Sequence, residues 1–175
     1  MKRLILMRHA KSSWSHDGLG DHERPLNKRG REAATRIGAF LKKRRMIPDQ
    51  VYCSTAERTR ETCKRVFKAA GETPAVEYRD DLYLASPKSM LNVARKSNAD
   101  AELAMLIGHN PGTHMLAIEL CGPDLSDIKE MSRMAPKYPT GAVACYSFDV
   151  NDWSDIELGA GALHFFATPK SLQDD

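Results

Sequence analysis

Four residues of this sequence have the side-chain types that anion chemistry needs: the neighbours Arg8 and His9, then Arg58 and His109. A guanidinium presents a planar fork of donors that matches phosphate oxygens, and its charge does not titrate. A metal site would require carboxylates beside the histidines and would not tolerate adjacent arginines, so we expect no metal here. Phosphoryl transfer fits best, because its catalysis consists largely of positioning and charge stabilisation. A neutral imidazole is also a competent nucleophile.

Each of these residues follows an apolar run that predicts a strand. Residues 4–7 and 103–107 are continuous apolar runs, as in strands buried on both faces, and 51–53 is a shorter candidate. The first run ends in the Arg–His pair, the second leads to His109, and the third precedes a predicted helix with Arg58 in its first turn. Ligands bind outside the carboxyl ends of such strands, so we expect one shared pocket. A single Arg–His pair would fit a surface turn equally well; the repetition favours a site.

The remaining pattern alternates strands with helices. Helices are predicted after Asn27 as N-cap, after Ser54 in a capping box with Glu57, and after Ser86 and Asn110 as further N-caps. Further strands are predicted at 75–78, within 140–150, and around 156–158 and 163–166, while 124–137 is read as a helix or loop. This order predicts an α/β fold, a three-layer sandwich with a largely parallel central sheet and helices on both faces.

Length and composition set the class of protein. The 175 residues predict one domain, 1–175, with a frayed tail at 171–175. A net charge of +3 is too small to favour nucleic acid, and no stretch approaches the roughly 18 apolar residues of a membrane span. No signal peptide is recognised, and the four cysteines form no C-x-x-C pair. We therefore expect a cytoplasmic protein with reduced cysteines and no membrane or nucleic-acid partner. The oligomeric state stays open.

Four separated motifs resemble those of the histidine phosphatase superfamily, whose fold is phosphoglycerate-mutase-like. They are R-H-A-K-S-S-W from Arg8, E-R-P-L-N-K-R-G from Glu23, S-T-A-E-R-T-R-E-T from Ser54 and G-H-N-P-G from Gly108. They occur in the family's order and extend over nearly the whole chain. The short length, without a large inserted cap, resembles the SixA-type branch of phosphohistidine phosphatases.

The resemblance implies roles for individual residues. His9 would be the nucleophile that becomes phosphorylated, while Arg8, Arg58 and His109 would hold the phosphoryl oxygens. Arg24 resembles an arginine that reaches the same pocket in the SixA branch.

Further residues near the motifs are candidates for substrate binding. Ser12 and Asn110 are predicted to bind substrate. Ser12, with Lys11 and Ser13, either touches phosphate or only caps the turn after the first strand, and the sequence leaves both open. Ala10 stands where Gly is commoner in the family, a small change.

The general acid of many family members is absent from its usual position. That position is occupied by the apolar Leu84, and Asp80 and Asp81 are the nearby carboxylates, either of which is left open as an acid. Loss of an acid costs about 10²–10⁴-fold for a poor leaving group, but phosphohistidine leaves readily. The sequence thus predicts a metal-independent, cofactor-free phosphatase acting on phosphohistidine in a protein.

Three other functions remain open. A small-molecule phosphomonoesterase for sugar or nucleotide phosphates would use the same chemistry. A non-catalytic phosphate-binding module would use the same pocket without turnover. A metal-dependent hydrolase would use the loop residues His16, Asp17, Asp21 and His22, whose geometry nothing in the sequence fixes.

Overall fold

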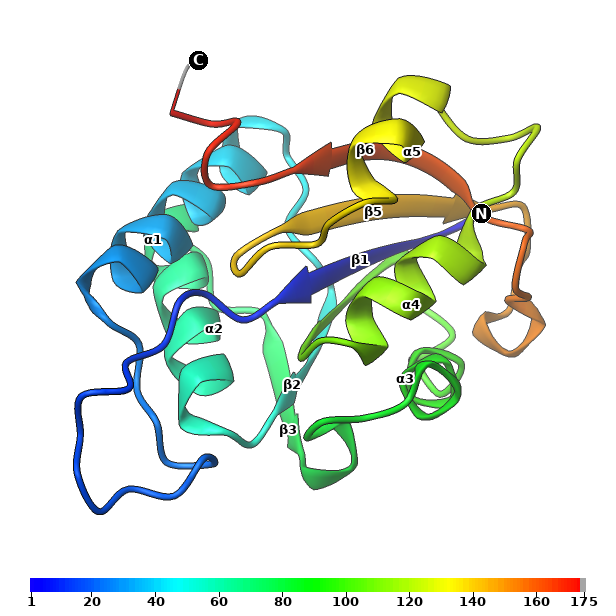
Figure 1. The fold of residues 1–175 in the computed structure, drawn as a ribbon. Coiled ribbons are helices and arrows are strands. Elements are labelled where there is room, and N and C mark those ends of the chain that lie inside the picture. The colour runs from blue at the N-terminus through cyan, green and yellow to red at the C-terminus, as the bar shows by residue number, and fades with distance from the viewer. Residues whose placement is uncertain (174–175) are drawn as a thin grey trace.

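The computed structural model describes residues 1–173 and has a six-stranded sheet between two layers of helices (Figure 1). The strands are β1 (Lys2–Arg8), β2 (Gln50–Ser54), β3 (Ala75–Arg79), β4 (Leu103–Gly108), β5 (Val143–Phe148) and β6 (Ala162–Ala167). The helices are α1 (Lys28–Lys43), α2 (Glu57–Ala70), α3 (Pro87–Ala94), α4 (Gly112–Leu120) and α5 (Ile128–Met134). The predicted α/β class is confirmed.

The sheet order β3-β2-β4-β1-β5-β6 determines where the site lies. The first four strands in this order run parallel, whereas β5 is antiparallel to both of its neighbours. The sheet is therefore largely parallel, as expected. The carboxyl ends of β1, β2 and β4 meet at one edge, and β6, which runs in the same direction as β1, ends at that edge too.

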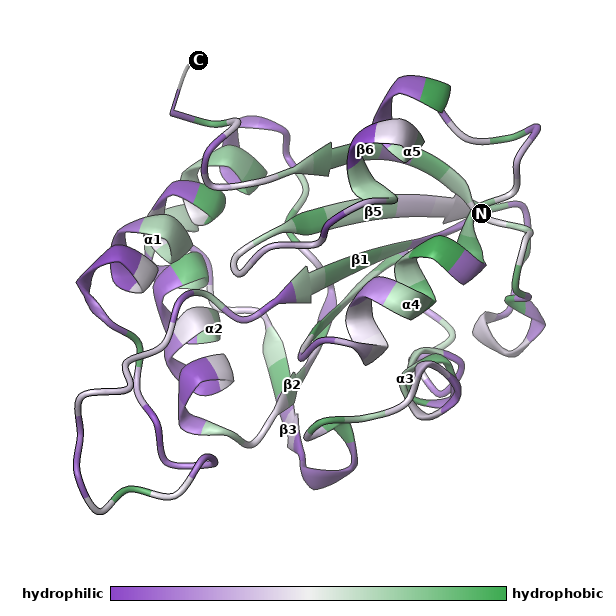
Figure 2. Cartoon of the chain, in the orientation of Figure 1, coloured by the Kyte–Doolittle hydropathy of each residue, from purple (hydrophilic) through white to green (hydrophobic). Residues whose placement is uncertain are grey.

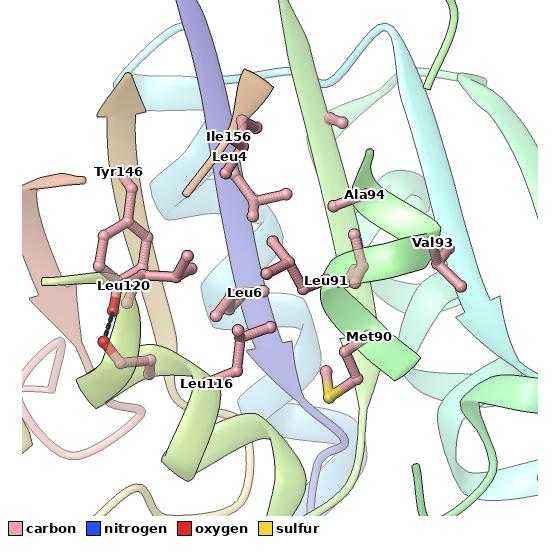
Figure 3. Packing of buried hydrophobic residues seen from close by; sticks show 14 of the residues in the cluster. Leu4, Leu6, Met90, Leu91, Val93, Ala94, Leu116, Leu120, Tyr146 and Ile156 are labelled. Atoms are coloured by element: carbon pink, nitrogen blue, oxygen red, sulfur yellow. Dashed lines mark hydrogen bonds between the residues drawn. The ribbon is translucent and has the colours of Figure 1, made fainter. Parts of the chain in front are cut away.

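Two apolar cores lie on the two faces of the sheet because side chains alternate along each strand. Leu4 and Leu6 of β1 face one core, with α3 and α4, and Ile5 and Met7 face the other, with α1 and α2. Figure 3 shows Leu6 packed among residues of these helices in the first core. There the Tyr146 hydroxyl donates to the Ala117 carbonyl oxygen at 2.8 Å, so this buried polar group is satisfied.

Hydropathy follows this layering. The strands are mostly apolar and the outer faces of the helices mostly polar, and the long loop between β1 and α1 is largely polar (Figure 2). Among the described residues, no helix combines the length and apolarity needed to cross a membrane.

The helix starts agree only in part with the predictions. Asn27 and Ser86 are N-caps, each accepting a hydrogen bond from a backbone N–H one turn on, as expected. The predicted capping box at Ser54 is wrong, because the N-cap of α2 is Ala56 and makes no side-chain bond. Asn110 is not the N-cap of α4 either, because Pro111 holds that position. The Asn110 side chain instead donates to the Tyr138 carbonyl oxygen.

One predicted strand is absent. Residues 156–158 follow the 3-10 turn Trp153–Asp155 and form no strand, because Ile156 and Trp153 enter the core from irregular backbone. The Trp153 indole N–H donates to the Ala101 carbonyl oxygen at 2.9 Å, which fixes that segment. Of the tail predicted to be frayed, residues 174–175 lie outside the described residues, whereas Ser171 is hydrogen-bonded to Thr168.

Candidate active site

The sheet brings the four central residues predicted from the sequence together. His9 follows β1, His109 follows the adjacent β4, and Arg58 lies in the first turn of α2 after β2, the next strand. The ring centroids of His9 and His109 are 5.3 Å apart. All four side chains are buried or half-buried at the carboxyl edge of the parallel strands, the edge that binds ligands in α/β sheets.

His9 is held in one tautomer. Its Nδ1 lies 2.7 Å from the Ala10 carbonyl oxygen, which only accepts, so Nδ1 carries the proton and Nε2 has the free electron pair. Burial, followed by the charges of Arg58, Arg8 and Arg24, lowers the pKa of His9 to about 3, against the opposing effect of the Ala10 hydrogen bond. At neutral pH this imidazole is uncharged, the state that a nucleophilic role would require.

The backbone around His9 is fixed from both sides. The Ala10 N–H donates to Thr62 Oγ1 at 3.0 Å, and that hydroxyl donates to the Arg58 carbonyl oxygen on α2. The His9 carbonyl oxygen accepts from the Gly141 N–H at 2.9 Å. His9 is therefore anchored to α2 and to the segment before β5.

Arg8 and Asn110 share one acceptor. The Nη1 of Arg8 and the Nδ2 of Asn110 each donate to the Tyr138 carbonyl oxygen at 3.0 Å. The Tyr138 hydroxyl in turn donates to the Leu6 carbonyl oxygen at 2.7 Å. Burial and the nearby charge of Arg58 lower the pKa of Arg8, a direction that any bound anion would oppose.

His109 is oriented by a serine that the sequence assigned to a capping box. Its Nε2 lies 2.7 Å from Ser54 Oγ at the end of β2. The Ser54 oxygen also accepts from the Ala56 N–H at 3.4 Å, so its own proton is available to His109 Nε2. In that arrangement Nδ1 of His109 bears a proton. Burial, followed by the neighbouring His9 and Arg58, lowers the pKa of His109 to about 3.

Arg24 and Ser12, both predicted to bind substrate, form a pair. Arg24 Nη2 donates to Ser12 Oγ at 2.5 Å, and the guanidinium carbon lies 3.4 Å from the centroid of the exposed Trp14 ring. Ser12 is tied to the backbone of Leu26 by an isolated bridge. Ser12 thus positions Arg24, while Ser13 bonds within its own turn and Lys11 is exposed.

Asp21, from the long loop, is part of the site, a role that the sequence analysis missed. Its Oδ2 accepts from Arg58 Nη2 at 3.0 Å and from the Tyr83 hydroxyl at 2.5 Å, and its Oδ1 lies 3.6 Å from Arg24 Nε. The Tyr83 hydrogen bond and then Arg58 lower the pKa of Asp21. The only signal in the sequence is its spacing three residues before Arg24.

Buried polar atoms without a hydrogen-bond partner mark the pocket. Among residues 1–173 six side-chain nitrogen or oxygen atoms are of this kind: Arg8 Nε, Arg24 Nε and Nη1, Arg58 Nε, His109 Nδ1 and Asn110 Oδ1. All belong to residues predicted as site residues, and all but the last are nitrogens. Such atoms are rare in folded proteins, because leaving one unpaired costs about 1–3 kcal/mol. Their concentration here fits an anion with several acceptor oxygens.

The two carboxylates considered as general acids are engaged elsewhere. Asp81 accepts from Arg79 through both oxygens, at 2.8 and 2.6 Å. Asp80 Oδ1 accepts from Thr55 Oγ1 at 2.7 Å. Neither contact involves the histidines or arginines of the pocket.

The loop residues of the metal-dependent alternative have other contacts. The His22 Nε2 lies 3.0 Å from Thr55 Oγ1, and Asp21 is bound by arginine. Within residues 1–173 no three His, Cys, Asp or Glu side chains gather as metal ligands would.

Comparison with known proteins gives consistent matches. Residues 4–83 match the histidine phosphatase superfamily (branch 1). An uncharacterized protein of Mycobacterium tuberculosis (strain H37Rv) is 34% identical over 164 residues, covering 94% of this chain and 100% of that protein. A proposed phosphohistidine phosphatase SixA of Agrobacterium tumefaciens has a TM-score of 0.80 at 27% identity, covering 96% of this chain and 98% of the other.

A second solved structure agrees. The proposed phosphohistidine phosphatase SixA of Nakamurella multipartitia also has a TM-score of 0.80, at 28% identity, and 96% of each chain is covered. These matches confirm the expected phosphoglycerate-mutase-like architecture. The order of the motifs, the related sequence and both structures agree: this chain belongs to the histidine phosphatase superfamily and, within it, to the SixA-type branch.

Proposed function

We propose that the chain is a metal-independent phosphatase that transfers a phosphoryl group to His9 and then to water, with phosphohistidine in a protein as substrate. Membership of the superfamily indicates phosphatase activity. The observation that carries the proposal is the fixed tautomer of His9, whose Nδ1 donates to the Ala10 carbonyl oxygen at 2.7 Å and leaves Nε2 unprotonated.

In the first step the electron pair of His9 Nε2 attacks phosphorus, and the bond from phosphorus to the substrate nitrogen breaks. That bond's electron pair goes to the departing imidazole, which leaves as a neutral ring when its second nitrogen carries a proton. The phosphoryl oxygens are held by the unpartnered nitrogens of Arg8, Arg58, Arg24 and His109. These donors stabilise the charge that spreads over the oxygens in the transition state.

In the second step water attacks phosphorus on His9. The bond from phosphorus to Nε2 breaks, its electron pair returns to Nε2, and inorganic phosphate leaves with the water oxygen. The low pKa of His9, about 3, favours recovery of the uncharged ring. The same pocket geometry therefore serves both steps.

Phosphohistidine is favoured as substrate by the state of the nearby carboxylates. Asp80 and Asp81 are held by Thr55 and Arg79, and Asp21 is held ionised by Tyr83 and Arg58. An alkoxide leaving group needs a proton from the enzyme, whereas a protonated imidazole does not. Titles of the related structures from A. tumefaciens and N. multipartitia name the same substrate class for those proteins.

The test compares a phosphohistidine protein, free phosphohistidine, p-nitrophenyl phosphate and a panel of sugar and nucleotide phosphates. Wild type is expected to prefer the phosphohistidine protein, to retain activity in EDTA, and to form an acid-labile ³²P adduct. His9→Asn should lose at least about 10³-fold in kcat. The exposed His164→Asn serves as the matched control.

Four results would contradict the proposal. Full activity of His9→Asn would exclude the mechanism, and so would loss of wild-type activity in EDTA. A preference for one sugar or nucleotide phosphate would make the chain a small-molecule phosphomonoesterase. Tight phosphate binding without any turnover would make it a phosphate-binding module.

A further inference from the structure

A groove lies beside the active-site edge, between α1 and two segments from the second half of the chain, 137–140 and 168–173. Its volume is about 580 Å³. In Figure 1 the end of β6 and the red segment after it run next to α1. The two walls are joined where Arg36 Nη1 donates to the Pro169 carbonyl oxygen at 3.2 Å. The groove is thus built from elements that the fold holds together.

The groove is strongly basic. Glu32 is the one acidic side chain among its lining residues, and five cationic ones accompany it: Lys11, Arg29, Arg36, Lys137 and Lys170. Among residues 1–173 none of these five forms an ion pair. The whole chain has nearly balanced charge, with 26 Lys and Arg against 23 Asp and Glu. The local excess of positive charge is therefore a feature of this surface and not of the composition.

The groove adjoins the pocket around His9. Lys11 comes two residues after His9 along the chain. The wall segment 137–140 also contacts the pocket, since the Tyr138 carbonyl oxygen accepts from Arg8. Gly141, directly after this segment, donates its N–H to the carbonyl oxygen of His9. A ligand that reaches from the pocket along this wall enters the groove.

The groove cations differ from the pocket cations in a way that indicates their ligand. Arg24 and Arg58 are buried with unpartnered nitrogens, as for one tightly held phosphoryl group. The lysines of the groove and Arg29 are exposed. Arg29 and Arg36 are two turns apart on α1, about 10.5 Å along its axis, a distance spanned by about three residues of extended peptide. Spaced cations, four of them exposed and Arg36 half-buried, suit carboxylates distributed along a chain.

We propose that this groove binds an acidic segment of the substrate protein, next to the phosphorylated histidine. The inference rests on the proposed function and specifies which phosphoproteins the site accepts. Opposite charges spread along such a surface raise association rates and select partners more than they hold a single group. Substrates with Asp and Glu near the phosphohistidine are therefore expected to have the higher kcat/KM.

The experiment uses two synthetic phosphohistidine peptides of equal length. One carries about four Asp or Glu residues, beginning three or more residues from the histidine, and the other carries Asn or Gln at the same positions. Wild type is expected to show about 10-fold higher kcat/KM on the acidic peptide at low salt. Because the groove is exposed, the preference should shrink in about 0.5 M KCl.

The variant Arg29→Glu/Lys170→Glu should abolish this preference and leave kcat/KM on p-nitrophenyl phosphate within about twofold of wild type. Its matched control is Lys64→Glu/Lys129→Glu, which makes the same change in net charge at exposed positions outside the groove. The control should retain the preference. Thermal unfolding of both variants checks that each is folded.

Equal kcat/KM of wild type on the two peptides would overturn the groove proposal while leaving the phosphatase activity intact. So would a preference that survives in Arg29→Glu/Lys170→Glu. If wild type had equal kcat/KM on the two peptides and Arg29→Glu/Lys170→Glu lost activity toward a sugar bisphosphate, the groove would be assigned to a small polyanion instead. Absence of turnover on every phosphate, p-nitrophenyl phosphate included, would overturn the proposed function itself.

Discussion

The Asp21 carboxylate lies against the Arg58 guanidinium, with Oδ2 3.0 Å from Nη2, while the Arg58 Nη1 donates to the Asp21 carbonyl oxygen at 2.6 Å. Arg58 is 3% exposed whereas the Asp21 side chain is 46% exposed, so the contact joins a buried guanidinium to a carboxylate that solvent reaches. A phosphoryl group that binds Arg58 through the same Nη2 must displace this carboxylate. Asp21 is therefore a competitor for the anion site.

Asp21→Asn should strengthen binding of inorganic phosphate. The amide removes a negative charge from beside Arg58 and Arg24, and we expect Kd for phosphate to fall about 3- to 10-fold. Isothermal titration measures this directly. Asp17→Asn, on the same loop and exposed, is the control and should leave Kd unchanged. Weaker phosphate binding in Asp21→Asn would mean that the carboxylate orders Arg58 instead of competing with the ligand.

The two buried histidines should make stability fall in acid. Their pKa values are lowered to about 3 in the folded protein, against about 6.5 in an unfolded chain. Between these values the unfolded chain binds protons that the native protein does not. Stability therefore rises with pH across this window and is lost as the pH falls, with a slope of up to about 1.4 kcal/mol per pH unit for each histidine.

His9→Gln should consequently lose less stability than wild type on acidification. From about pH 7 to about pH 5 the expected difference is about 1–2 kcal/mol, measured by urea unfolding at both values. His164→Gln, on the exposed side of β6, should behave as wild type. Identical pH dependence of wild type and His9→Gln would show that His9 binds a proton in the folded state as readily as in the unfolded chain.

Ser54→Ala tests whether the serine orients His109. Without the hydroxyl, His109 Nε2 loses its 2.7 Å partner, and we expect kcat on p-nitrophenyl phosphate to fall about 10-fold. Ser54→Thr, which keeps a hydroxyl, should recover much of the activity.

A double-mutant cycle with His109→Ala separates this role from simple destabilisation. If Ser54 acts through the imidazole, the double variant should be no less active than His109→Ala alone. Additive losses would instead indicate that Ser54 contributes independently.

Gly30→Ala should be destabilising even though Gly30 lies in a helix. Alanine is the better helix former by about 1 kcal/mol, so propensity predicts stabilisation. A Cβ at this position would, however, overlap the carbonyl oxygen of Lys11, backbone that cannot move away cheaply. We expect a loss of about 2–4 kcal/mol in urea unfolding, with reduced activity because the turn after His9 shifts. A stabilised Gly30→Ala would contradict this packing.

The sequence predicted the main features of the pocket for a physical reason. Apolar runs ending in Arg or His are local patterns, and parallel strands necessarily bring their carboxyl ends together, so the convergence of His9, Arg58 and His109 followed. The contacts of Asp21 and Ser54 are long-range, between a loop and α2 and between neighbouring strands. Local patterns carry no information about them. The same holds for the groove, whose cations come from separate elements.

The error at 156–158 has the same origin. Ile156 is fully buried, as a strand residue would be. It follows a 3-10 turn, however, and packs from irregular backbone into the core that contains Leu4 and Leu6. Apolar spacing reports burial and not backbone conformation, so short runs of this kind are ambiguous.

The position of β4 between β1 and β2 makes assembly of the site a late event. β1 pairs only with β4 and β5, both from the second half of the chain, so residues 1–83 contain no partner strand for the one that delivers His9. During synthesis, β5 must be completed before β1, the strand that leads to His9, can pair with a strand on each side. Two separately expressed fragments, divided in the exposed turn at 98–100, should each be inactive and regain activity on mixing, which makes catalysis a reporter of fragment complementation for this fold.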